Sequence, residues 1–252
     1  VVVAVRFAGS NLPEIYADFV VLRVFPIERL DHAQWEREVH AHLLRHGLAV
    51  PEIFDVLVVE QRVVQLMSRL PGRQMADLMV RRPWAVRSLA DGLGELLASV
   101  HAVPVTGFPG HPWGSLLARR LAGGERTRQV QASVDRAREL IEAAGAHVAV
   151  HGDFHPLNVL VDRVGSRALL DWTDAGLAQP EADLARLETA LDLAAEAAPT
   201  ALERLAVGAI RTRFPARVRR SYEAHSGRRI QTELLSAWRV VHRVHDLSEV
   251  AR

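Results

Sequence analysis

The chain of 252 residues contains no cysteine and no lysine. The absence of cysteine excludes a disulfide framework, although it fits either side of a membrane. All 31 basic residues are therefore arginines, and they stand against 30 acidic residues for a formal net charge of +1. Because the two signs are mixed along the chain without a long basic block, the sequence lacks the footprint of a nucleic-acid-binding protein.

Long apolar runs are also missing. None reaches the roughly 18 residues that a membrane span needs, and no positively charged segment precedes Val1. We therefore expect a cytoplasmic protein with small-molecule partners and no membrane contact. The 49% hydrophobic content is enough for a sizeable core in one large domain or two lobes. The sequence does not begin with Met, which suggests that residues precede Val1.

Two short apolar runs in the second half of the chain predict a β-hairpin. Residues 159–161 and 168–170 flank a turn-rich spacer that contains Gly and Ser. With residues 163–166 as the loop, Asn158 lies directly opposite Asp171, and their Cβ atoms are about 4.5–5.5 Å apart. An amide oxygen and a carboxylate at that separation could share Mg²⁺, which prefers oxygen ligands and usually keeps water and phosphate in its remaining positions.

A second carboxylate, Asp153, lies in the Gly- and Pro-containing loop 151–158 just before this hairpin. One loop and one hairpin thus offer a base and a metal site. Phosphoryl transfer needs this combination, because a carboxylate orients the attacking hydroxyl and the metal neutralises charge on the phosphates.

A metal-dependent hydrolase is an alternative for the same loop. His151, Asp153 and His155 could form a metal cluster, because imidazole and carboxylate are common zinc ligands. This alternative leaves the hairpin partner Asp171 without a role.

The segment HGDFHPLN, residues 151–158, followed by LLDWTDAGLAQPEADLA, residues 169–185, resembles the aminoglycoside phosphotransferase family. The resemblance implies that Asp153 is the catalytic base and that Asn158 and Asp171 are the Mg²⁺ ligands. It further implies that Asp183 braces the loop.

The N-terminal part of the chain is similar to the same family. The resemblance implies that a turn containing Gly9 and Ser10 covers the nucleotide phosphates. It also implies that Arg23, on the predicted strand 20–25, is the cationic phosphate ligand. The family has Lys or Arg at this position, and an arginine can grip phosphate oxygens with its planar fork where a lysine is a point charge.

A helix after Asp31 offers two glutamates as partners for Arg23, Glu36 and Glu38. Because they are two positions apart they point to different faces, so at most one can pair with Arg23. The family's spacing favours Glu38. The resemblance also implies a hinge at 68–70, where the backbone of Ser68, Arg69 and Leu70 would meet the nucleobase.

Three acidic residues, Glu188, Asp192 and Glu196, recur at helical spacing after the hairpin. Such a stripe is usually a solvated helix face. The alternative is an acidic wall for a cationic substrate, as aminoglycoside-modifying members of the family have. The arginine-rich segment that follows argues against that alternative.

We therefore expect an α+β, two-lobed protein-kinase-like fold. Residues 1–72 would form a small antiparallel β N-lobe with one helix, and residues 73–252 a larger, mainly helical C-lobe with the catalytic β-hairpin.

The expected activity is Mg²⁺-dependent transfer of the γ-phosphoryl group of ATP or GTP to a hydroxyl of a small molecule. A nucleotide-binding module without turnover is the alternative, motivated by the Arg at the usual Lys position and the short Gly turn. The acceptor, and ATP against GTP, stay open.

Overall fold

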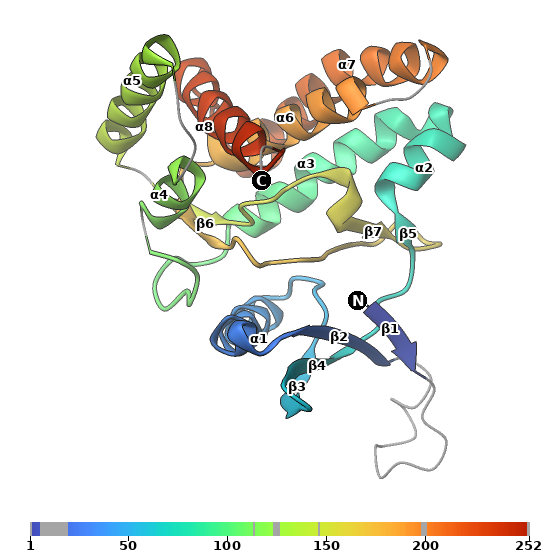
Figure 1. Cartoon of the computed structure of the whole chain (residues 1–252). Coiled ribbons are helices and arrows are strands. Elements are labelled where there is room, and N and C mark those ends of the chain that lie inside the picture. Colours follow the sequence, from blue (N-terminus) through green and yellow to red (C-terminus); the bar gives the residue numbers. More distant parts are fainter. Residues whose placement is uncertain are drawn as a thin grey trace.

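An antiparallel sheet forms the N-terminal part of the chain in the computed structural model (Figure 1). The structure describes residues 2–5, 20–112, 114–122, 127–145, 147–197 and 201–250. The sheet has the order β1-β2-β4-β3 and consists of β1 (Val2–Val5), β2 (Val20–Pro26), β3 (Ile53–Val59) and β4 (Arg62–Ser68). Alternate residues of β4 are buried, as expected for a strand with one covered face.

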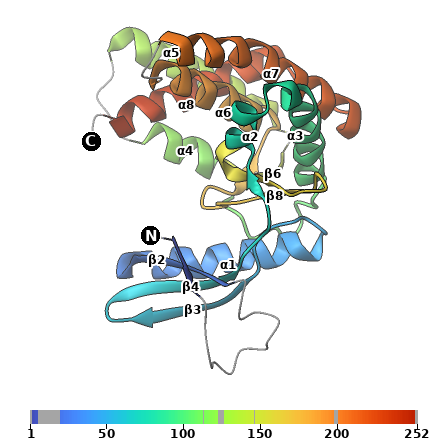
Figure 2. The same cartoon turned by 90° about the vertical axis from the view of Figure 1, so that its right-hand side faces the viewer.

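Helix α1 (Leu30–Arg45) covers that sheet, and it follows the short helix η1 (Ile27–Arg29) (Figure 2). Val39 and Leu43, four positions apart on one face of the helix, are fully buried. Trp35 links the helix to the rest of the chain, because its indole N–H donates to the Pro109 carbonyl at 2.7 Å. Its ring also lies 4.3 Å from that of His111, centre to centre.

Helices dominate the remaining chain. They are α2 (Met75–Arg81), η2 (Pro83–Ala85), α3 (Val86–His101), α4 (Ser115–Leu121), α5 (Arg128–Ala144), η3 (Pro156–Asn158), α6 (Glu181–Ala197), α7 (Ala201–Ser226) and α8 (Thr232–Val250). Leu93, Leu97 and Val100 recur at helical spacing on α3 and are completely buried, so this face of the helix belongs to the core. None of the helices in the described ranges combines the length and apolarity of a membrane span.

Two small antiparallel sheets lie between α1 and the helices of the remaining chain (Figure 1). One has the order β5-β7-β8, with β5 (Arg73–Gln74), β7 (Val159–Val161) and β8 (Arg167–Leu169). The other pairs β6 (Val148–Val150) with β9 (Gly176–Ala178). The chain passes from β6 to β7 through residues 151–158 and from β8 to β9 through residues 170–175, so both connections join the same two sheets. The expected α+β class with small antiparallel sheets is confirmed.

The register of the β7–β8 hairpin differs by one residue from the predicted register. Val161 pairs with Arg167, and the Leu170 N–H donates to the Asn158 carbonyl at 2.8 Å. Asn158 therefore lies opposite Leu170 and not opposite Asp171. The cause is Asp162, which belongs to the loop because its carboxylate accepts backbone N–H bonds from Val164 at 2.9 Å and Ser166 at 2.8 Å.

We expect Asp162→Ala to lower the free energy of unfolding by about 1–3 kcal/mol, because two hydrogen bonds of about 0.5–1.5 kcal/mol each are lost. Asp162→Asn is the matched control, since its amide oxygen can accept the same bonds. Urea unfolding of the three proteins measures the difference. Equal midpoints for the alanine variant and the parent protein would contradict this account of the register.

Candidate functional site

The loop 151–158 is held in place from beneath by Asp183 of α6, which is fully buried. One carboxylate oxygen accepts the His151 backbone N–H at 2.9 Å, and the other accepts the Gly152 N–H at 2.8 Å. The His101 ring nitrogen Nε2 lies 3.1 Å from the same carboxylate. Asp183 therefore braces the loop by accepting two of its backbone N–H groups. Sequence reasoning gave His101 no role, because nothing in a helical pattern shows that the last residue of α3 meets α6.

His151 is a structural part of this loop. Its Nδ1 accepts the Asp153 backbone N–H at 3.2 Å, so Nε2 carries the proton that is donated to the Leu170 carbonyl at 2.8 Å. With both ring nitrogens engaged, His151 has no lone pair left for a metal. Within the described ranges, no group of three His, Cys, Asp or Glu side chains could hold a metal ion. The geometry therefore argues against the zinc-type cluster of His151, Asp153 and His155.

Asp153 lies at the centre of a polar cluster. Its Oδ1 accepts from Arg186 Nε at 2.7 Å, and its Oδ2 lies 3.2 Å from His155 Nε2 and 3.2 Å from the Asn158 amide nitrogen. Burial raises the pKa of this carboxyl, but the hydrogen bond and charge of His155 and the charge of Arg186 outweigh burial. The net pKa lies well below its ordinary value, so the group is a carboxylate at neutral pH.

Arg186 is a second site residue that sequence reasoning missed. It bridges two carboxylates, since its Nη1 lies 3.0 and 3.1 Å from the two oxygens of Asp246 on α8. Asp246 is itself buried. The available signal was the spacing of Arg186 from Asp183, because side chains three positions apart on a helix share a face.

Asn158 and Asp171 carry side-chain oxygen atoms just outside the two strands of the β7–β8 hairpin. The Asn158 amide group donates to the Asp153 carbonyl at 2.9 Å, which leaves its side-chain oxygen as the atom that could face a cation. Asp171 has φ of +59°, in the left-handed region where residues other than glycine are uncommon and often functional. Its side chain is 40% exposed. An amide oxygen and an accessible carboxylate suit Mg²⁺, which takes few protein ligands.

Arg23 connects the N-terminal sheet to this site. Its Nη2 lies 3.1 Å from Asp171, and its Nη1 lies 2.9 Å from Glu36. Glu36 is completely buried and also accepts from the Gln65 amide at 3.1 Å. The prediction that Glu38 is the ion-pair partner of Arg23 is wrong, because Glu36 occupies that position. Residues 33, 36, 39 and 40 form the buried face of α1, whereas Glu38 falls on the exposed face.

The expected hinge residues lie at the end of β4 and beyond it. The Ser68 backbone N–H is already used, since it donates to the Glu52 carbonyl at 2.8 Å. Arg69 is exposed and Leu70 is half-buried. Gly9 and Ser10 lie outside the described residues.

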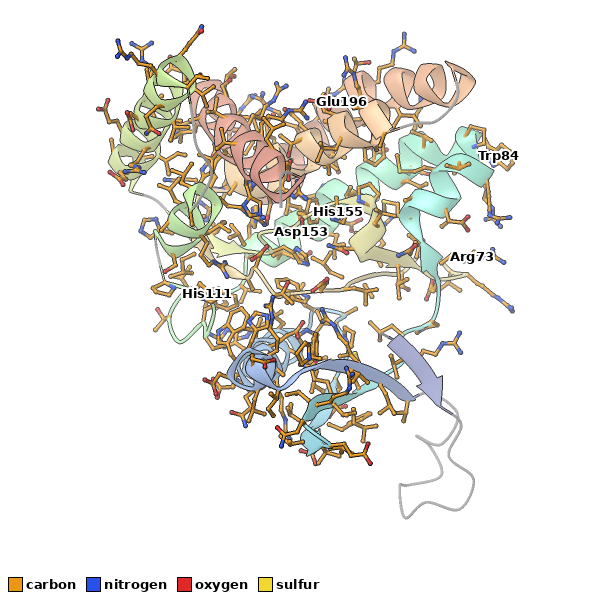
Figure 3. The ribbon with its side chains drawn as sticks, in the orientation of Figure 1. Arg73, Trp84, His111, Asp153, His155 and Glu196 are labelled. Carbon is orange, nitrogen blue, oxygen red and sulfur yellow. The ribbon has the colours of Figure 1, made fainter. Side chains whose placement is uncertain are left out.

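The acidic stripe of α6 is paired with arginines of α7 and α8. Glu188 lies 3.3 Å from Arg239, Asp192 lies 3.2 Å from Arg211, and Glu196 lies 2.5 Å from Arg243. Figure 3 shows Asp153 and His155 next to each other, with Glu196 well apart from them. The stripe is therefore a set of interhelical ion pairs, and it does not form an acidic wall at the site.

The fold is that of kinase-like phosphotransferases. A solved aminoglycoside phosphotransferase APH(3'')-Id from Streptomyces rimosus ATCC10970, in complex with ADP and streptomycin, is similar with a TM-score of 0.66 and 17% identity over 90% of this chain and 87% of that chain. A type VIII aminoglycoside-3'-phosphotransferase has a TM-score of 0.65 and 18% identity over 89% and 84%. The macrolide 2'-phosphotransferase MphH from Brachybacterium faecium has a TM-score of 0.60 and 21% identity over 92% and 80%.

The model of the phosphotransferase enzyme family matches residues 16–225. The chain belongs to this family. No curated protein matches the sequence. The resemblance to aminoglycoside phosphotransferases and the expected enzyme class, a small-molecule O-phosphotransferase, are confirmed.

We expect Arg186→Met to raise the pKa of Asp153, because the substitution removes a cation that favours the ionised carboxylate. Carboxyl ¹³C NMR of labelled protein would follow the titration on acidification. Asp246→Asn is the control, since it removes the other partner of Arg186 and keeps the guanidinium on Asp153. A pKa that is unchanged in Arg186→Met would show that His155 alone holds it down.

Proposed function

We propose that the protein transfers the γ-phosphoryl group of ATP or GTP to a hydroxyl of a small molecule, with Mg²⁺ as the cofactor. The ion pair between Arg23 and Asp171 carries this proposal. It joins a cation from the N-terminal sheet to a carboxylate at the end of the central hairpin, next to the loop of Asp153. A cation, a metal ligand and a base at one place are the parts that phosphoryl transfer requires.

Arg23 would bind the nucleotide phosphates. Its guanidinium is fixed on one side by the buried Glu36, so it keeps its direction when phosphate oxygens replace Asp171 as its second partner. Asp171 would then be free to turn its carboxylate toward a cation. This arrangement suits an arginine better than a lysine, because the two terminal nitrogens of one guanidinium contact two different carboxylates, those of Glu36 and Asp171.

Asn158 and Asp171 would hold Mg²⁺, whose charge neutralises the β- and γ-phosphates when it is bound. The Asn158 amide group supports this role, since its N–H contacts to Asp153 direct the oxygen away from the base. The same contacts hold the base and the metal ligand at a fixed separation.

Asp153 would accept a hydrogen bond from the acceptor hydroxyl and hold it in line with the phosphorus. Its pKa is held below the ordinary value, so it is a weak base. The loose transition state of phosphoryl transfer tolerates this, because the hydroxyl proton need not leave before the bond to phosphorus forms. Asp153 would thus act first by orientation, and it would take the proton late.

The similar structures support a nucleotide and a hydroxylated acceptor as partners. The Streptomyces rimosus enzyme was solved with ADP and streptomycin. In a two-lobed arrangement with a boundary near residue 72, the backbone of residues 68–70 would meet the nucleobase. Residues 9 and 10 would cover the phosphates, and the acceptor would lie against residues 73–252.

We expect Asp153→Asn to lower acceptor-dependent turnover by about 10²–10⁴-fold, the usual loss when a catalytic acid or base is removed. Nucleotide affinity should stay nearly unchanged, whereas Asp171→Ala should also weaken Mg²⁺-nucleotide binding. Release of ADP or GDP and calorimetric binding measure the two effects. Tight Mg²⁺-nucleotide binding without turnover for any acceptor would favour a binding module.

We expect Glu36→Gln to raise the KM for nucleotide about tenfold or more, because a hydrogen bond to a charged group contributes about 1.5–3 kcal/mol and here it orients Arg23. Glu38→Gln is the matched control, since it makes the same change two residues away on the exposed face. Equal KM values for both variants would show that Glu36 does not position Arg23.

A further inference from the structure

A pocket of about 450 Å³ opens beside the loop that carries Asp153. Its walls come from α2, η3, α6 and the described part of α7. The volume falls within the range of about 300–1,000 Å³ that is typical of small-molecule sites. The pocket is therefore large enough to hold the body of a small ligand.

The pocket reaches the base through two shared residues. His155 and Arg186 both line it, and both contact the Asp153 carboxylate, at 3.2 and 2.7 Å. The pocket therefore lies one side chain away from the Asp153 carboxylate.

The other described residues that line this pocket are all apolar. Met79 and Val80 come from α2, Pro156 and Leu157 from η3, and Leu193 from α6. Val80 and Leu157 are 79% and 55% exposed, so apolar surface continues from the pocket to its rim. A ligand with an apolar body would cover this surface and gain free energy in proportion to the area buried.

The charges on the wall disfavour a polycation. No carboxylate is present among the described residues that line the pocket, and Arg186 is a cation. The two carboxylates that contact Arg186, those of Asp153 and Asp246, are both absent from the lining of the pocket. Ammonium groups in such a pocket would lose water without gaining an anionic partner. The acidic residues of α6 cannot supply one, because arginines of α7 and α8 hold them elsewhere.

We propose that this pocket binds the acceptor and that the acceptor carries its hydroxyl on a neutral, largely apolar body. The description of the ligand as the acceptor rests on the proposed function. The apolar character of the ligand follows from the pocket itself.

An equilibrium experiment tests the class of ligand without turnover. The fluorescent probe 1-anilinonaphthalene-8-sulfonate is titrated against the intact protein and then displaced by octyl β-glucoside below its micelle concentration, by methyl β-glucoside or by streptomycin. The two glucosides carry the same sugar and differ in apolar length. We expect displacement at a concentration at least about tenfold lower for the octyl compound, because each buried methylene contributes about fourfold to affinity, and no displacement by streptomycin.

Two substitutions locate the probe. Ala190→Phe fills the pocket, and Ala194→Asp adds a carboxylate at its exposed side; each should weaken probe binding about tenfold, which corresponds to about 1.4 kcal/mol. Ala143→Asp is the matched control, because Ala143 is also an exposed alanine near the end of a helix but lies on α5. Circular dichroism confirms that each variant is folded.

The outcomes separate the two proposals. Displacement by streptomycin at a lower concentration than octyl glucoside, or unchanged probe binding in both pocket variants, would overturn the apolar pocket. Nucleotide turnover is measured in parallel with Asp153→Asn as the blank. If the probe behaves as expected but no acceptor releases ADP or GDP, the proposed function fails while the apolar ligand site stands.

Discussion

The loop that carries the candidate base depends on one buried carboxylate, that of Asp183. Backbone N–H groups of His151 and Gly152 point inward at this position and would be unsatisfied without it. Gly152 is suited to the bend because its φ is +82° and an added Cβ would lie 2.3 Å from the Asp174 carbonyl oxygen. His101, anchored in turn by the Tyr222 hydroxyl at 3.0 Å, completes the support from the helical core. The position of Asp153 thus follows from contacts made by its neighbours.

The opposite side of the site depends on a chain of contacts that starts in the N-terminal sheet. Gln65 on β4 and Glu36 on α1 hold each other, Glu36 holds Arg23, and Arg23 reaches Asp171. Each link is local in space, although Arg23 and Asp171 are 148 positions apart in the chain. A shift of α1 relative to the sheet would therefore change the direction of the guanidinium. Nucleotide binding would consequently be coupled to the packing of the N-terminal part of the chain.

The sequence allowed the loop 151–158 and the hairpin to be predicted, because each depends on residues that are close in the chain. Prediction failed where the outcome depends on contacts between distant segments. The choice between Glu36 and Glu38 is decided by the orientation of α1 on the sheet, which a spacing rule carried over from other proteins does not contain. The hairpin register was predicted wrongly because the Asp162 side chain accepts two backbone N–H bonds within the loop. Asp162 therefore belongs to the loop and does not pair as a strand residue. Arg186 was missed because its second partner, Asp246, comes from another helix.

The cations around this site are all arginines that bridge two acceptors, which a lysine could not do with the same geometry. Arg23 and Arg186 each bridge two carboxylates, and Arg120 bridges the Gly152 carbonyl at 2.9 Å and the Asp174 carboxylate at 2.5 Å. A guanidinium can do this because its donors point in several fixed directions within one plane, whereas an ammonium group is a compact point charge on a flexible stem. The bridges therefore fix angles as well as charges. In the proposed mechanism, catalysis by orientation would require fixed directions around Asp153 and Asp171, and the arginine bridges would supply that rigidity.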